Sequence, residues 1–184
     1  MLLYFIRHGQ TDWTKDMRMQ GQSDIPLNEN GRESAIEAGK TLANTHIDLA
    51  FSSPLKRAKE TAELVLAGRD IPIIEDKRIE EICFGICEGM KGRDENGQPV
   101  GCFAEFFAHP EQYKAPENGE DAKMLCARTW NFLEDITTRE ELQDKSILIA
   151  THGAALQSMM LWVNKQPICD FWKSGLKKNC SVTK

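Results

Sequence analysis

The sequence contains no long hydrophobic run. Its longest apolar helical stretch, residues 154 to 163, is interrupted by Gln157 and Ser158 and falls short of the roughly 18 apolar residues of a membrane span. The N-terminal stretch, Met1 to Ile6, has no leading positive charge and is too short for the apolar core of a signal peptide. We therefore expect a protein that is neither exported nor membrane-spanning, and that is located in the cytoplasm.

An excess of basic residues is also missing. The chain has 23 Lys and Arg residues against 28 Asp and Glu residues, a formal net charge of -5 at pH 7. Nucleic acid or an anionic membrane as the main partner would require a broad basic face. The charge balance argues against both partners, although it still allows local basic pockets.

No internal repeat, linker or low-complexity tract interrupts the chain. With 184 residues, of which 41% are hydrophobic, it can close one sizeable core, which excludes collagen-like, fibrous and disordered classes. We expect a single domain over residues 1–184. A chain with such a core needs no disulfide bonds. The cysteines are therefore expected as reduced thiols at positions 83, 87, 102, 126, 169 and 180.

Short apolar runs alternate with helical patterns along the chain. Leu2 to Ile6 and Ser146 to Ala150 are uninterrupted, as is typical of strands covered on both faces of a parallel sheet. The alternation predicts a three-layer α/β/α sandwich with a largely parallel central sheet. Further strands are expected at 47–51, 71–75 and 181–183, the last suggesting a truncated or partly disordered C-terminus. Helices are expected at 28–44, 53–68 with Pro54 in the first turn, 103–107, 120–142 and 154–163, with an irregular loop over 10–30.

Two of these strands end in the same way. The first runs into His8-Gly9 and the later one into His152-Gly153. Because ligands of open parallel sheets bind beyond the carboxyl ends of the strands, both imidazoles should reach one edge. The helix after Gly153 would direct free N–H groups at an anion, most naturally one of phosphate size. For either His-Gly alone, a half-buried, hydrogen-bonded histidine is the simpler explanation, but matching positions make coincidence less plausible.

Two arginines are expected near the same edge. Arg7 precedes His8, and Arg57 lies in the first turns of the helix that follows the second strand. A guanidinium suits bidentate contact with phosphate oxygens, so two of them would neutralise most of a phosphomonoester dianion without a metal. Taken alone, Arg57 is better explained as a solvated charge on its helix. Only its combination with Arg7 and the two histidines favours a role in binding phosphate.

Glu80 and Glu81 follow the third strand and are candidates for a proton donor. A carboxyl group that is partly desolvated beside a phosphate dianion has its pKa raised and can protonate a leaving alkoxide near neutral pH. A pair of surface glutamates is the simpler alternative, and position alone does not separate the two residues.

Five sequence blocks occur in a specific order. The first holds Arg7-His8-Gly9-Gln10-Thr11 with Trp13, Gln20-Gly21, Asp24-x-Pro26-Leu27 and Gly31. The others are Ser52-Ser53-Pro54-Leu55-x-Arg57-Ala58-x-x-Thr61-Ala62, Glu81-Ile82-x-Phe84-Gly85-x-x-Glu88-Gly89, Asn118-Gly119-Glu120 and Thr151-His152-Gly153. Together, over residues 2 to 183, they resemble the histidine phosphatase superfamily, the phosphoglycerate mutase-like proteins.

This resemblance implies a phosphoglycerate mutase-like fold and a set of roles. His8 would be the nucleophile that forms a phosphohistidine, and Glu81, rather than Glu80, would be the acid and later the base. Arg7, Arg57 and His152 would bind the phosphoryl group, and Glu120 would orient His8 or its neighbours. The substrate-binding residues would be Thr14, Gln20, Gly21, Glu120, Gly153 and Ala154.

The sequence departs from the family pattern at three positions. Thr14 stands where Asn is frequent, and Gln10 where Glu is common. Ala154 leaves only backbone N–H groups after His152-Gly153. None of these departures changes the core residues.

The segment from Cys83 to Gly119 is rich in glycine, proline and aromatic residues, and we expect it to form a lid that determines specificity. Mutases of the family hold the substrate carboxylate with basic residues after the acid block. This shorter chain resembles the broad-specificity or α-ribazole phosphatases instead, with Lys91, Arg93 and Lys114 interleaved among Phe103, Phe106, Phe107 and Tyr113.

We therefore expect a hydrolase of small phosphomonoesters, with a cofactor-dependent mutase or a catalytically weak phosphate-binding module as alternatives. No cofactor and no metal are expected, because Cys83-x-x-x-Cys87 has no second pair nearby. A homodimer remains open.

Overall fold

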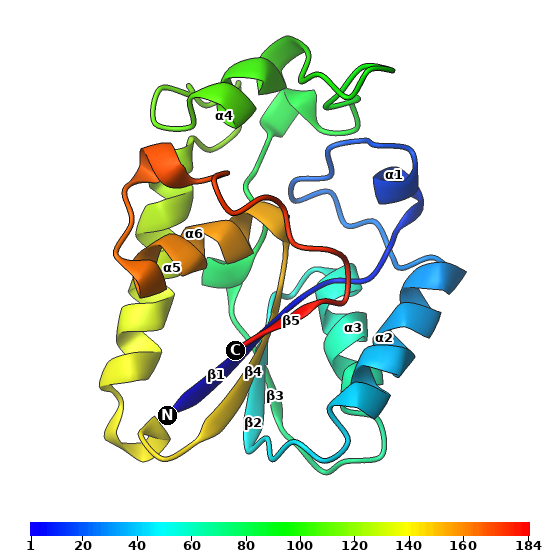
Figure 1. Cartoon of the computed structure of the whole chain (residues 1–184), viewed down its shortest axis with the longest axis vertical. Coiled ribbons are helices and arrows are strands. Elements are labelled where there is room, and N and C mark those ends of the chain that lie inside the picture. The colour runs from blue at the N-terminus through cyan, green and yellow to red at the C-terminus, as the bar shows by residue number, and fades with distance from the viewer.

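The computed structural model describes all 184 residues and contains one five-stranded sheet in the order β3-β2-β4-β1-β5 (Figure 1). The first four strands in this order run parallel, and β5 pairs antiparallel with β1. This confirms the predicted largely parallel sheet. The strands are β1 (Leu2–Arg7), β2 (Leu49–Ser52), β3 (Ile73–Glu75), β4 (Ser146–Thr151) and β5 (Val182–Thr183).

Helices cover both faces of the sheet, which confirms the three-layer arrangement. In Figure 1, α2 and α3 lie to the right of the strands and α5 and α6 to the left. One hydrophobic cluster lies under each pair: Ala35 and Ala62 belong to the smaller cluster, and Leu125 and Leu156 to the larger. The helices are α1 (Asp12–Lys15), α2 (Glu29–Thr41), α3 (Lys56–Val65), α4 (Ala104–Ala108), α5 (Ala122–Thr138) and α6 (Gly153–Asn164). Short 3-10 turns are η1 (Lys77–Ile79), η2 (Gly85–Cys87), η3 (Gly101–Phe103), η4 (Glu140–Leu142) and η5 (Ile168–Asp170).

The register of the two central strands fixes the position of the site. All six residues of β4 are buried, as its unbroken apolar run predicts for a strand covered on both faces. In the pairing of β1 with β4, Arg7 lies opposite Thr151. The residues that follow these two, His8 and His152, therefore leave the sheet side by side at the carboxyl edge.

Two local expectations were wrong. The loop over 10–30 contains the one-turn helix α1, which is closed by a capping box between Thr11 and Thr14. A threonine at the third helical position is not the Glu or Gln of the usual capping sequence, so the pattern gave no signal. The second error concerns α3, which begins at Lys56 after an extended Leu55, so Pro54 lies before the helix rather than in its first turn.

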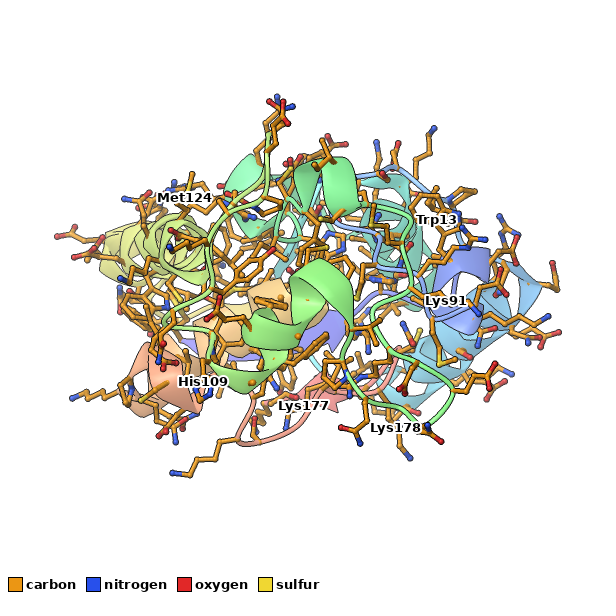
Figure 2. All side chains as sticks on the ribbon, turned by 90° about the horizontal axis from the view of Figure 1, so that it is seen from above. Trp13, Lys91, His109, Met124, Lys177 and Lys178 are labelled. Carbon is orange, nitrogen blue, oxygen red and sulfur yellow. The ribbon has the colours of Figure 1, made fainter.

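The segment from Cys83 to Gly119 lies across the carboxyl end of the sheet, at the top of Figure 1. Figure 2 looks down on it and labels Lys91 and His109 within it. Phe106 of this segment packs against Phe84 within the segment and against Trp172 outside it, at ring centroid distances of 5.4 and 5.3 Å. None of the helices is both long enough and apolar enough to cross a membrane.

Candidate active site

His8 and His152 lie against each other where the two central strands end. Their ring centroids are 5.2 Å apart and the rings are tilted by 56°. Both residues are buried. The structure thus brings the two predicted imidazoles to one place.

His8 is oriented for nucleophilic attack through one nitrogen. Its Nδ1 lies 2.7 Å from the carbonyl oxygen of Gly9, so Nδ1 carries the proton and donates, which leaves the lone pair on Nε2. Burial, followed by the positive charges of Arg57 and Arg7, lowers the pKa of His8 well below its ordinary value. The imidazole is therefore neutral near pH 7, as a nucleophile at phosphorus must be.

Arg7 and Arg57 approach the site from β1 and α3. Arg7 donates from Nη1 to the carbonyl of Lys177, and Arg57 donates from Nη1 and Nη2 to the carbonyls of Ser23 and Gly21. Burial lowers the pKa of Arg57 to about 10, so its guanidinium remains charged at neutral pH. In each arginine the Nε atom is buried without a hydrogen-bond partner.

His152 shows the same incomplete pairing. Its Nε2 lies 2.8 Å from the hydroxyl oxygen of Ser53, while its Nδ1 is buried without a partner. Buried nitrogens that lack a partner are costly and rare in folded proteins. Only four such side-chain atoms occur in the chain, and three of them belong to Arg7, Arg57 and His152. Arg7 and Arg57 line the same cavity as His8, and His152 lies against His8, so two guanidinium groups lie where an anion could bind.

Glu81 lies at the N-terminus of α6. Its carboxylate accepts hydrogen bonds from the backbone N–H groups of Ala154, at 3.1 Å, and Ala155, at 3.0 Å. These free N–H groups and the positive end of the helix dipole stabilise a negative charge there. Glu81 also lines the cavity beside His8. Its carboxylate therefore belongs to the same site as His8.

Glu80 does not share this position. It is absent from the cavity lining, and burial raises the pKa of its carboxyl group. The geometry thus separates two glutamates that their position in the sequence could not.

A cavity of about 100 Å³ connects most of the predicted site residues. Of the residues expected in the site, only His152, which lies against His8, and Glu120 are outside its lining. The residues that line it are Arg7, His8, Thr14, Arg18, Met19, Gln20, Gly21, Arg57, Glu81, Phe84, Phe106, Phe107, Gly153, Ala154, Trp172 and Leu176.

The structure refines two expectations about individual side chains. Glu120, expected to orient His8 or its neighbours, makes no hydrogen bond to His8; its carboxylate binds Arg128 and the backbone N–H of Cys83, which leaves only the second alternative. Thr14 does line the cavity, but in the capping box its hydroxyl accepts from the backbone N–H of Thr11, and it also donates to the carbonyl of Thr11. The Thr14 hydroxyl is therefore already engaged.

A second, larger cavity of about 570 Å³ adjoins the first. The two share Arg7, Arg18, Phe107 and Trp172 among their linings. This outer cavity also contains Arg93, whose guanidinium lies over the ring of Phe107 at 4.5 Å from the centroid. No acidic side chain lines it.

Glu88 was not identified as a site residue, although it belongs to one of the sequence blocks. Its carboxylate accepts hydrogen bonds from the backbone N–H groups of Gln22 and Ser23, both at 2.8 Å. That loop supplies the carbonyls that hold Arg57. Glu88 therefore supports the loop that holds Arg57.

Asn179 was missed as well. Its side-chain amide donates to the carbonyl of His8 at 2.7 Å. Nothing around position 179 in the sequence distinguishes it from a surface asparagine.

No three His, Cys, Asp or Glu side chains form a group that could hold a metal ion. The thiol of Cys83, in the Cys83-x-x-x-Cys87 sequence, donates to the carbonyl of Asn118.

Comparison with known proteins agrees with this geometry. A 2,3-bisphosphoglycerate-dependent phosphoglycerate mutase of Cytophaga hutchinsonii is 32% identical over 167 residues, which cover 89% of this chain and 78% of the relative. Among solved structures, Bacillus stearothermophilus YhfR is 35% identical with a TM-score of 0.86, covering 98% of this chain and 88% of that one. The α-ribazole phosphatase from Shigella flexneri is 26% identical with a TM-score of 0.85, covering 99% and 88%.

These likenesses confirm the predicted phosphoglycerate mutase-like fold. The family described as "Histidine phosphatase superfamily (branch 1)" matches residues 3–184, nearly the whole chain. The chain therefore belongs to the histidine phosphatase superfamily.

Proposed function

We propose that this protein is a phosphomonoester hydrolase that acts on small phosphorylated metabolites through a phosphohistidine at His8. The observation that carries the proposal is the set of unpartnered buried nitrogens on Arg7, Arg57 and His152 around a neutral imidazole. Arg7 and Arg57 line the inner cavity together with His8 and can bind the non-bridging oxygens of a phosphoryl group there, and His152 lies against His8.

In the first step, the lone pair on Nε2 of His8 attacks phosphorus and the bond from phosphorus to the ester oxygen breaks. The protonated carboxyl of Glu81 gives its proton to the departing oxygen, so the leaving group departs as an alcohol. Arg7 and Arg57 stabilise the charge on the phosphoryl oxygens as the transfer proceeds.

In the second step, a water molecule attacks the phosphohistidine. The Glu81 carboxylate, held meanwhile by the N–H groups of Ala154 and Ala155, takes a proton from that water. The bond from phosphorus to Nε2 breaks, its electron pair returns to His8, and phosphate leaves. The sum of both steps is one ester and one water converted to one alcohol and one phosphate.

The outer cavity supports a hydrolase over a mutase. A mutase must keep a phosphorylated intermediate from water, whereas here a volume of about 570 Å³ lies beside the inner cavity. Of the three basic lid residues Lys91, Arg93 and Lys114, only Arg93 lines this volume. One of the similar structures, the α-ribazole phosphatase from Shigella flexneri, is a hydrolase by name, while a mutase is among the sequence relatives.

The test compares two activities of the purified protein. Release of phosphate from a panel of sugar and nucleotide monoesters should exceed the interconversion of 2- and 3-phosphoglycerate. Faster interconversion would establish the mutase instead. If the native protein hydrolyses no ester while His8→Ala binds phosphate, the protein is a phosphate-binding module.

The proposed location is the cytoplasm, where thiols stay reduced. All six cysteines are free in the structure, which supports this location.

A further inference from the structure

The segment that carries Glu81 is held by side chains rather than by a neighbouring strand. It runs from Arg78 to Cys83, and the carbonyls of its first four residues all accept hydrogen bonds from side chains. Three of these, at Arg78, Glu80 and Glu81, are bound by Arg128 at distances of 2.9, 2.7 and 2.8 Å. The fourth, at Ile79, is bound by the hydroxyl of Thr151 at 2.8 Å.

Arg128 uses its whole guanidinium in this contact. Nη1 donates to two of the three carbonyls, and Nη2 donates to the carbonyl of Glu81 and to Oε2 of Glu120. Nε donates to Oε1 of Glu120 at 2.8 Å. All five N–H donors of the side chain are thereby engaged, a geometry that only the planar fork of arginine provides.

Glu120 secures the other end of the segment. Its Oε2 accepts from the backbone N–H of Cys83 at 2.9 Å, and its own N–H donates to the carbonyl of Cys83 at 2.8 Å. Arg128 and Glu120 thus hold the chain on both sides of Glu81. Their side chains are only 19% and 16% exposed, so solvent screens the pair less than it screens a surface ion pair.

The carboxyl of Glu81 is held separately from its backbone. The backbone is bound by Arg128, and the carboxylate by the first N–H groups of α6. A general acid contributes only within about 2.6–3.2 Å of the atom it protonates, so a small displacement of its backbone removes its contribution.

We propose that Arg128, oriented by Glu120, is a positioning residue that keeps the carboxyl of Glu81 within reach of the leaving oxygen. Arg128 lines neither cavity, so it touches neither substrate nor His8. The proposal rests on the proposed function, in which Glu81 is the proton donor.

Esters with different leaving groups distinguish a positioning role of Arg128 from a purely structural one. An alkyl phosphate, such as glycerol phosphate, releases a strongly basic alkoxide and needs the proton of Glu81. With 4-nitrophenyl phosphate, the weakly basic phenolate needs it far less. The ratio kcat/KM includes only the steps up to departure of the leaving group, so it isolates the acid from the later action of Glu81 as a base.

The variant is Arg128→Lys, which keeps the charge but cannot form the fork. We expect its kcat/KM to fall on the order of 100-fold for the alkyl ester and less than about threefold for the aryl ester, since general acid catalysis contributes about 10²–10⁴-fold. In a Glu81→Gln background, the same substitution should cause no further loss with the alkyl ester. Arg139→Lys, just beyond the end of the same helix and paired only with Asp135, is the matched control and should leave both ratios unchanged.

An equal loss with both esters, or the same loss in the Glu81→Gln background, would overturn the proposal. If Arg128→Lys does not fold, Glu120→Gln decides by the same two ratios, because it weakens the charged grip on Arg128 while still accepting from Cys83. A native protein that hydrolyses neither ester would contradict the proposed function itself. If the native protein hydrolyses both esters but Arg128→Lys lowers kcat/KM equally for both, only the role of Arg128 is contradicted.

Discussion

The carboxylate of Glu88 binds the backbone N–H of Ser23 at 2.8 Å, and the carbonyl of Ser23 accepts a hydrogen bond from Arg57, also at 2.8 Å. The carboxylate of Glu88 thus supports an arginine that lines the same cavity as His8. The two halves of the active site are connected through this loop, and Gly21 belongs to it. A β-carbon at Gly21 would overlap Oε1 of Glu88, and its φ of 53° is in the left-handed region.

Glu88→Gln should loosen this loop. Gln22 and Ser23 donate to different oxygens of Glu88, so the amide nitrogen that replaces one oxygen leaves one of these two N–H groups without an acceptor, and a lost charged hydrogen bond costs about 1–3 kcal/mol. We expect a lower free energy of unfolding in urea and a higher KM, with kcat reduced much less because Glu81 and His8 stay in place. An unchanged KM would show that the loop holds Arg57 without Glu88. Glu75→Gln, which removes a half-exposed partner of Lys59, is the control.

Arg57→Lys should strongly weaken phosphate binding. A lysine cannot donate to the carbonyls of Gly21 and Ser23 and also offer a planar edge to a phosphoryl group. We expect kcat/KM to fall on the order of 100-fold, comparable to the loss of one oxyanion donor. The rise in thermal stability that inorganic phosphate gives the native protein should be lost in parallel. Full retention of that rise would place the phosphate elsewhere.

The acidic limb of the pH profile reports on His8. Burial, together with Arg57 and Arg7, lowers its pKa well below the ordinary value of about 6.5. Neutral imidazole is the attacking form, so kcat/KM should fall only when the pH drops below that ordinary value. A limb at or above pH 6.5 would contradict the buried, cation-flanked environment.

The free energy of unfolding should depend on the protonation of His8 and His152. The pKa values of His8 and His152 are both lowered by burial in the folded state, so below about pH 6.5 the unfolded chain binds more protons than the folded one. The free energy of unfolding should therefore decrease as the pH falls through this range. Urea unfolding measured at several pH values should show a shallower decrease for His152→Gln than for the native protein, and an equally steep decrease would assign the effect to other groups.

Arg93→Gln should change affinity without changing the chemistry. Arg93 lines only the outer cavity, where it stacks on Phe107. Esters large enough to extend into that cavity should show a changed KM. For a small ester such as methyl phosphate, kcat/KM should stay within about twofold of the native value. The lost cation–π contact with Phe107 contributes only about 0.5–1 kcal/mol at an exposed site, so the inner cavity should keep its shape. A large loss for the small ester would mean that Arg93 contacts the reacting phosphoryl group.

Much of the fold could be predicted from local pattern. The unbroken apolar runs that became β1 and β4 indicated strands covered on both faces, and the His-Gly pair after each run indicated one edge. Asn28 caps α2 through its side chain, as expected for an asparagine before a helix. Position alone indicated Arg7, His8 and His152 at such strand ends, while the family resemblance was needed to separate Glu81 from Glu80 and to indicate Gln20 and Gly21.

The residues that support the site could not be found in the same way. Arg128 lies in an amphipathic helix, where a single charge looks like any solvated position, and its partners at 78, 80 and 81 are backbone carbonyls with no sequence signature. Its only signal was its spacing of eight residues from Glu120, about two helical turns. The partners of Glu120 could not be predicted for a related reason, because they depend on tertiary packing.

The central claim is tested most directly by trapping the phosphoryl group during turnover. The protein is mixed with a radiolabelled monoester, quenched in base because phosphohistidine is acid-labile, digested and mapped. We expect label on the peptide that holds His8, lost on brief acid treatment and absent in His8→Gln. Turnover without protein-bound label, or label on another residue, would contradict the phosphohistidine at His8.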